Sequence, residues 1–301
     1  MKKKVLMLGA GLTLGSALLV TSAFADIGGA RGYEAYKDAL KQTAATSSAT
    51  QRIALALQDN GKSLLNVTTT VKEDGKDVSG KAAIQSGGTS QNFEFYNQDG
   101  QSVLKAGNSD TYFVTNESGK REMKHADRFK DNPQLSKEME NVVDALVGNL
   151  KNEVVLSGSE DGQHSIDMKL TGSRIPSAAN VIGSLLIKEM SGKDMQSKMA
   201  HRPMGSQALG LDVAQITAEF PELTQDVNID EVSLHADIDG DQHINSQTIG
   251  FKISGKDASG QSHNVVIRAD IDTSDLGTTT PDSVNLTGKK VQKIEFADFE
   301  H

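Results

Sequence analysis

Acidic residues at alternate positions form the arrangement in this sequence that comes nearest to a metal site. Asp237, Asp239 and Asp241 stand in Asp-Ile-Asp-Gly-Asp, and carboxylates at the first, third and fifth positions of a loop suit a calcium ion. An EF-hand loop also needs glycine at its sixth position and glutamate at its twelfth, where this chain has Gln242 and Thr248. The pattern favours an acidic turn that ends a strand, and we predict no metal site.

Histidines are the other residues that could do chemistry. His235 and His243 flank the acidic turn and could join a metal site there, but a histidine on the polar face of an exposed hairpin is the more ordinary interpretation. The other five follow no ligand spacing such as His-Glu-x-x-His; they are His125, His164, His201, His263 and His301.

Motifs of nucleophilic catalysis and of phosphate binding are absent from the sequence. It holds no Gly-x-Ser-x-Gly, and its glycine-rich stretch lies within residues 9–15, close to the N-terminus. We therefore predict no catalytic residue and no cofactor, and expect a protein that is not an enzyme. A secreted hydrolase stays as an alternative, because the paired carboxylates of glycoside hydrolysis have no local signature.

The N-terminal residues have the pattern of a signal peptide. Three lysines precede an apolar run from Val5 to Val20, and Ala23-Phe24-Ala25 supplies small residues for cleavage. An uncleaved membrane anchor is the alternative, which three glycines in the run and the cleavage motif disfavour. Cleavage after Ala25 would leave 276 of the 301 residues as an exported protein of the cell envelope or medium, without a transmembrane anchor.

Charge and cysteine content exclude several classes of partner and site. The formal charge of −9 becomes −12 once the three lysines of the leader are removed, which argues against nucleic acid and anionic membranes, since both attract clustered lysine and arginine. The chain has no cysteine, so disulfides, thiolate metal sites and lipidation at a cysteine are excluded.

Two series of strands must position any site. Alternation of apolar and polar residues predicts three antiparallel strands near 232–239, 248–254 and 265–271. A further ladder of at least five strands is predicted within 52–115, where Asn60-Gly61, Asp74-Gly75 and Asp99-Gly100 mark hairpin turns. A last short strand is expected at 291–296.

Four helices are predicted around these strands. Tyr33, Tyr36 and Leu40 share one face of a first helix, and residues 43–50 then read as a loop. Helices at 133–150 and 176–190 begin near Pro133 and Pro176, and a fourth at 212–220 ends before Pro221. We expect one domain over 26–301, with a flexible, methionine-containing segment at 191–207.

This order of elements resembles the lipoprotein-carrier superfamily, the LolA-like and LppX-like proteins of the cell envelope. The resemblance covers most of the chain after the leader and rests on element order, not on a motif. It implies an α+β fold in which a large antiparallel curved sheet, a half-barrel, has helices packed across its concave face and a cavity for acyl chains between. Many such proteins are lipidated at a cysteine, which this chain lacks.

The resemblance implies a non-catalytic binding protein for a lipid or another apolar ligand. Two alternatives stay open, a structural or protein-interaction module of the envelope with a filled core, and the secreted hydrolase. The apolar sides of the two central helices would line the cavity opposite the last strands. The expected lining residues are Leu135, Met139, Val143, Leu146, Val181, Leu185, Met190, Ile249, Phe251, Ile253, Val265 and Ile267.

Overall fold

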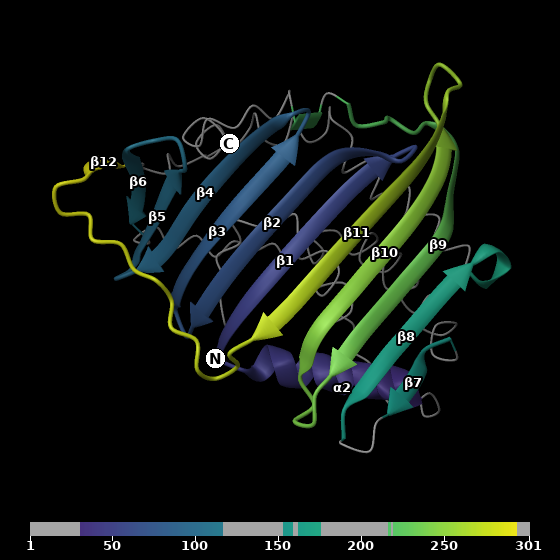
Figure 1. Cartoon of the computed structure of the whole chain (residues 1–301), viewed down its shortest axis with the longest axis horizontal. Coiled ribbons are helices and arrows are strands. Elements are labelled where there is room, and N and C mark those ends of the chain that lie inside the picture. The colour runs from purple at the N-terminus through teal and green to yellow at the C-terminus, as the bar shows by residue number, and fades with distance from the viewer. Residues whose placement is uncertain (1–30, 117–152, 159–161, 176–215, 218, 294–301) are drawn as a thin grey trace, which may run out of the picture.

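The computed structural model describes residues 31–116, 153–158, 162–175, 216–217 and 219–293 (Figure 1). The signal peptide, the helices expected at 133–150 and 176–190 and the segment 191–207 lie outside these residues. The same holds for His125, His201 and His301.

One helix and twelve strands make up most of the described chain. The helix is α2 (Arg31–Ala45), and a short 3-10 turn, η1 (Gly172–Arg174), follows β8. The strands are β1 (Ser48–Asp59), β2 (Lys62–Asp74), β3 (Asp77–Ser86), β4 (Thr89–Gln98), β5 (Gln101–Ala106), β6 (Thr111–Asn116), β7 (Val155–Gly158), β8 (His164–Thr171), β9 (Gln225–Ile238), β10 (Ile244–Lys256), β11 (Ser262–Ser274) and β12 (Lys290–Lys293). Both predicted series of strands are confirmed.

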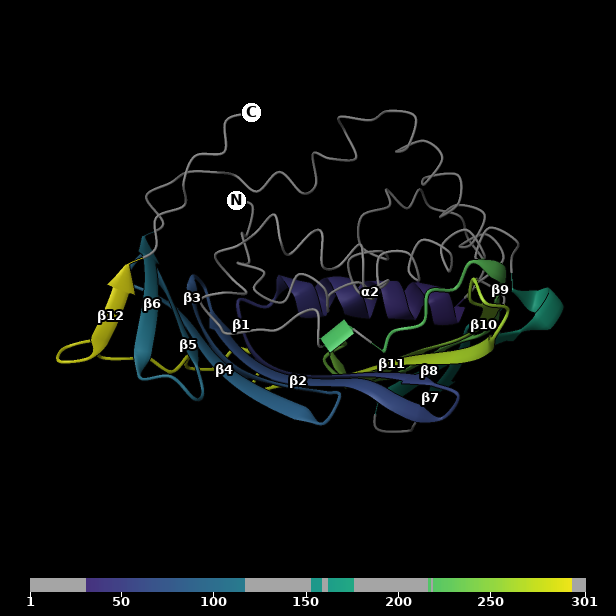
Figure 2. The same ribbon diagram turned by 90° about the horizontal axis from the view of Figure 1, so that it is seen from above.

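All twelve strands belong to one open sheet, in the order β12-β6-β5-β4-β3-β2-β1-β11-β10-β9-β8-β7. Figure 2 shows that this sheet is curved. Every neighbouring pair is antiparallel except β12 and β6, which run parallel. The expectation of a wholly antiparallel sheet is therefore wrong at this edge, because β12 arrives along a connection that crosses several strands instead of through a hairpin.

Pairing of β1 with β11 joins the two series of strands into one surface. Ten residue pairs form this contact, from Thr50 opposite Ser274 to Asp59 opposite Val265. Leu57 lies opposite Ile267, and Ile267 lies opposite Phe251 of β10. Since side chains alternate between the two faces of a strand, this register places the apolar residues of both series on the same face. We call it the apolar face, and its opposite the polar face.

Helix α2 packs on the apolar face, across β8 to β10 (Figure 2). Tyr36 and Ala39 belong to one buried cluster with Ile166 and Leu234, and the Tyr36 hydroxyl donates to Oε1 of buried Gln247 at 2.9 Å. The predicted loop at 43–50 is wrong, because the helix continues to Ala45 and β1 starts at Ser48.

Tertiary contacts account for the extra helical and strand residues in that region. The Thr43 hydroxyl donates to the Ala39 carbonyl at 2.8 Å and accepts from the Ile244 amide at 2.8 Å, which fixes the last turn of α2 against β10. The buried Ser48 hydroxyl donates to the Thr279 carbonyl at 3.0 Å. Neither partner could be identified from the local sequence.

Residues 275–289 form a strap that runs from β11 to β12 along the ends of β1 to β4 (Figure 1). The Asp282 amide donates to Ser79 Oγ at 2.7 Å, and the Val284 amide donates to Gln98 Oε1 at 2.8 Å. Lys72 pairs with Asp282 at 3.0 Å. These contacts bring the chain to the far edge of the sheet, where β12 pairs with β6.

Two clusters of buried apolar residues lie on the apolar face, one under α2 and one around Leu57, Ile253 and Val265. Met168 and Phe251 pack against both clusters, so the two form one core. Within the described residues, no helix combines the length and the apolar character that crossing a bilayer requires.

Truncating Leu57 tests the β1–β11 junction. Leu57 is 2% exposed, so we expect Leu57→Ala to lower the free energy of unfolding by about 2–5 kcal/mol, through lost burial and the cavity left behind. The same change at Leu156 on the edge strand β7, where the side chain is 36% exposed, should cost less than about 1 kcal/mol. Urea unfolding measures both, and equal losses would contradict the central position of this junction.

Candidate functional site

The five strand residues predicted to line a cavity share the apolar face. Ile253 lies opposite Val265, and Phe251 lies opposite Ile267, in the register of β10 with β11. Ile249, Ile253 and Val265 are buried, whereas Phe251 and Ile267 are half-buried. The other seven predicted lining residues, from Leu135 to Met190, lie outside the described residues.

The apolar face continues beyond these residues, across β1 to β4. Leu55 of β1 lies opposite Ala269 of β11 on one side and Val67 of β2 on the other. Val67 lies opposite Ile84 of β3, and Phe93 of β4 is buried on the same face. Strands that are distant in sequence therefore form one wide apolar surface.

Residues 219–224 cover one end of this surface. Phe220 packs in the cluster around Leu57, and Leu223 packs against it. The Thr224 amide donates to the Lys256 carbonyl at 2.9 Å. A Cβ on Gly255 would lie 3.1 Å from Leu223 Cδ1, so glycine allows this close approach. Of the fourth predicted helix, 212–220, the described residues Ile216 and Thr217 are helical, whereas Glu219 lies in a turn and Phe220 is not helical.

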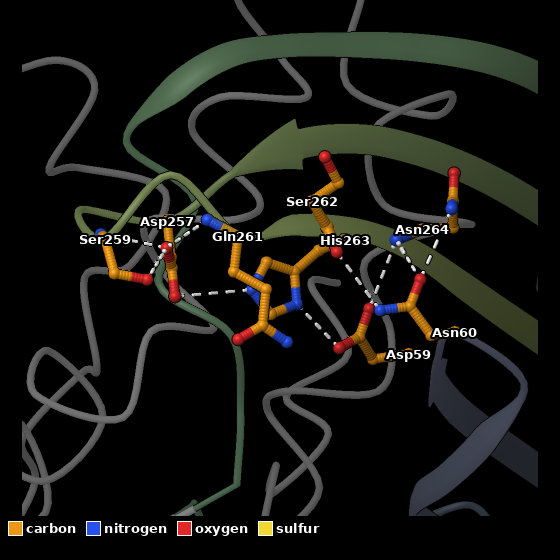
Figure 3. A network of polar contacts seen from close by, with 8 residues as sticks. All are labelled: Asp59, Asn60, Asp257, Ser259, Gln261, Ser262, His263 and Asn264. Atoms are coloured by element: carbon orange, nitrogen blue, oxygen red, sulfur yellow. Dashed lines mark hydrogen bonds and ion pairs between the residues drawn. The ribbon is translucent and has the colours of Figure 1, made fainter.

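A polar network stands at the same end, where two hairpins meet (Figure 3). Nδ1 of His263 donates to Asp59 Oδ2 at 2.7 Å, and Nε2 lies 3.6 Å from Asp257 Oδ2. Asp257 Oδ1 accepts from the amide and hydroxyl of Ser259, at 2.9 and 2.7 Å, and from the Gln261 amide at 2.9 Å. Asp59 Oδ1 accepts from the Asn264 amide at 3.2 Å.

Two carboxylates hold the imidazole of His263 in a buried position. The residue is 8% exposed, and burial by itself lowers the pKa of the ring. The hydrogen bond and charge of Asp59, followed by those of Asp257, outweigh burial and raise the pKa of His263 above its usual value. Hydrogen bonds from Ser259 and Gln261, together with His263, lower the pKa of Asp257, so this carboxylate stays charged.

The geometry around His263 is that of a pH-sensitive clamp between turns. Its Nδ1 is committed to Asp59, and Nε2 faces the carboxylate of Asp257. A histidine that acts as a base for a nucleophile must reach a hydroxyl or thiol, and within the described residues no such group hydrogen-bonds to His263. Protonation at Nε2 would instead create a second ion pair with Asp257.

The acidic turn at 237–241 adopts the geometry of a hairpin turn. Asp239 Oδ1 accepts from the amides of Asp241 and His243, at 3.0 and 2.8 Å, and the Asp239 amide donates to the His243 carbonyl at 2.9 Å. Thr248, at the twelfth position of the motif, donates to Asp270 Oδ1 at 2.6 Å. The interpretation as a strand-ending turn is confirmed.

His235 lies on the polar face, as its position in the alternation predicts. Its side chain is 46% exposed, with Nδ1 2.8 Å from Asp167 Oδ1 and Nε2 3.4 Å from Asp237 Oδ1. The hydrogen bond to Asp167 raises the pKa of His235, against a smaller lowering by partial burial. Because these side chains are exposed, solvent screens the attraction between His235 and the two aspartates, and the pairs contribute little to stability.

Sequence reasoning did not single out His263 or Asp59 as a pair. A signal was present, because each falls in the apolar series of its strand, Asp59 after Leu57 and His263 before Val265. Polar residues at such positions need a partner when buried. The partner could be identified only once β1 was known to pair with β11.

Replacing His263 with glutamine tests the clamp. The pKa of His263 is higher in the folded than in the unfolded chain, so its stabilising contribution is fully present below about pH 6.5 and is lost as pH rises through the folded pKa. We expect His263→Gln to cost about 1.5–3 kcal/mol at pH 5.5, the range of a charge-assisted hydrogen bond, and less at pH 9.

Urea unfolding at both pH values gives the measurement, with His235→Gln as the matched control. The control should cost less at pH 5.5, because His235 is exposed to solvent. A loss for His263→Gln that is equal at the two pH values, or larger at pH 9, would contradict the clamp.

Comparisons with known proteins assign no family. No protein-family model matches the chain, and no curated protein is similar in sequence. A variant of the PpsC dehydratase domain from Mycobacterium tuberculosis shares 12% identity at a TM-score of 0.12, over 82% of this chain and 84% of that chain. A protein from Thermobifida fusca YX, described as a thioesterase II, also shares 12% identity at a TM-score of 0.12, over 83% of this chain and 88% of that chain. Scores this low carry no argument about fold or activity.

Proposed function

We propose that the protein is an exported, non-catalytic binding protein that holds a lipid or another apolar ligand against the apolar face of its sheet. The observation that supports this proposal is the continuity of that face from β4 across β1 and β11 to β9. The proposal places the chain among the half-barrel lipoprotein carriers that it resembles, with helices of residues 133–150 and 176–190 packed over the concave side.

Apolar residues in the middle of the face offer a surface that a ligand could cover. Leu55, Ile267 and Ala269 are half-buried and lie near the centre of the sheet. Burial of an acyl chain against such residues is worth roughly 0.8 kcal/mol per methylene. A chain of moderate length would therefore bind without any charged group.

Ala269 is the position that best separates a ligand cavity from a filled core. It lies between Leu55 of β1 and Ile249 of β10 on the apolar face. We expect Ala269→Phe to occupy the space of the ligand, and so to weaken binding of a fluorescent fatty-acid probe by at least about tenfold while leaving stability nearly unchanged. In a filled core the same change would overpack the interior and cost about 1–3 kcal/mol.

Ala54→Phe is the matched control, because Ala54 is a half-buried alanine of β1 that lies on the polar face, opposite Asp270. Its probe affinity should stay within about twofold of the unsubstituted protein. Native mass spectrometry of the full chain should in addition detect a copurifying apolar ligand. Failure of the unsubstituted protein to bind the probe, together with destabilisation by Ala269→Phe, would overturn the proposal and favour a protein-interaction module with a filled core.

A further inference from the structure

A second candidate site lies on the polar face of β1 to β4, opposite the surface proposed for the apolar ligand. It is an open pocket of about 350 Å³, within the range of small-molecule sites. Two rows of residues build it. The first row crosses β1 to β4, each residue lying opposite the next, and consists of Arg52, Thr70, Lys81 and Glu94. In the adjacent row, Thr68 of β2 lies opposite Ala83 of β3.

The two rows differ in side-chain length, and this difference shapes the pocket. Thr68 and Ala83 are short and form a floor, beside the long side chains of Arg52 and Lys81. The strands of these two cations flank β2, so their Cα atoms lie roughly 10 Å apart. Thr70 lies between them, and its hydroxyl adds a hydrogen-bonding group between the two charges.

Neither cation is neutralised within the described part of the chain. Arg52 lies opposite Asp272 in the register of β1 with β11, yet the ion pairs of the described residues include neither Arg52 nor Lys81. Most other basic residues of the sheet are paired. On the same face, Arg268 donates to both oxygens of Asp270 at 2.8 and 2.6 Å, and Lys252 lies 3.1 Å from Glu231.

The nearest carboxylate is held by a different partner. Glu94 lines the pocket, but its Oε2 accepts from the Tyr96 hydroxyl at 3.0 Å. Burial and this hydrogen bond raise the pKa of Tyr96 to about 12, so the phenol keeps its proton and remains a donor to Glu94. Asp282 of the strap is likewise paired with Lys72. The negatively charged carboxylate of Glu94 lies opposite Lys81 in the register, but the ion pairs of the described residues do not include one between them.

The rest of the lining offers neutral hydrogen-bonding groups. Thr68 and Thr70 carry hydroxyls, and Asn92 carries an amide. The Gly107 amide donates to the Asn92 carbonyl at 2.6 Å, and a Cβ on Gly107 would lie 3.0 Å from Asn92 Cβ. Glycine thus lets the loop after β5 close one side of the pocket. Groups of this kind bind hydroxyls of a ligand.

We propose that this pocket binds a small phosphate ester that carries hydroxyl groups, with Arg52 and Lys81 holding the phosphate from either side. Both cations form charge-assisted hydrogen bonds to phosphate oxygens, and arginine can do so with two parallel N–H groups. Thr68, Thr70 and Asn92 bind the hydroxyls. The site is independent of the apolar face, so the two proposals can fail separately.

Isothermal titration calorimetry of the full chain with glucose 6-phosphate tests the site, with inorganic phosphate and glucose as the two partial ligands. We expect glucose 6-phosphate to bind most tightly, inorganic phosphate more weakly and glucose not measurably. Arg52→Ala and Lys81→Ala should each weaken binding of glucose 6-phosphate by about tenfold or more, the fold-change that corresponds to about 1.4 kcal/mol.

Lys252→Ala is the matched control, because Lys252 lies on the same face but is paired with Glu231. Its affinity for glucose 6-phosphate should stay within about twofold of the unsubstituted protein. Arg52 and Lys81 are exposed, so their substitution should leave the urea midpoint unchanged. Absence of binding by the unsubstituted protein at millimolar glucose 6-phosphate, or an equal loss in Lys252→Ala, would overturn the proposal.

Discussion

The pairing of β1 with β11 is the constraint on which the rest of this molecule depends. It brings residues about 200 positions apart into a ladder of ten pairs, from Thr50 with Ser274 to Asp59 with Val265. Because side chains alternate on every strand, a slip of one residue in this ladder would turn one series of apolar side chains to solvent. The cluster that includes Leu57, Ile253 and Val265 exists only in the observed register.

The same junction gives each face its chemistry. On one side it aligns Leu55, Ile267 and Ala269 with the apolar residues of β2 and β10. On the other it places Arg52, which takes part in no ion pair of the described residues, beside strands whose basic residues Lys252 and Arg268 are paired with acids. The ligand site proposed on the apolar face thus draws its residues from both series of strands, whereas the pocket on the polar face lies within the first series.

The ends of the strands are fixed by polar contacts that the junction also creates. His263 of β11 reaches Asp59 of β1 and faces Asp257 of the adjoining turn (Figure 3). At the opposite end, the strap leaves β11 and is tied to Ser48, Ser79 and Gln98 before β12 pairs with β6. Both ends are therefore held by hydrogen bonds between segments distant in sequence.

The sequence by itself determined the elements of this protein and the faces of its strands. Alternation and Asn-Gly or Asp-Gly turns were enough to predict the strands of both series, since these signals act over a few residues. Helix α2 was predicted from the spacing of its apolar residues, but its end was not, because Thr43 and Ser48 are held by distant partners. The acidic turn at 237–241 was also correctly interpreted from its own residues.

Only the tertiary structure decided which strands meet. Nothing local in Ile53, Leu55 or Leu57 specifies Ile271, Ala269 and Ile267 as partners, because strand pairing over long separations depends on the whole sheet and its burial. The parallel edge at β12 and the clamp around His263 both follow from such pairings. They could not be predicted from the sequence, since each needs residues whose proximity arises only when the complete sheet has formed.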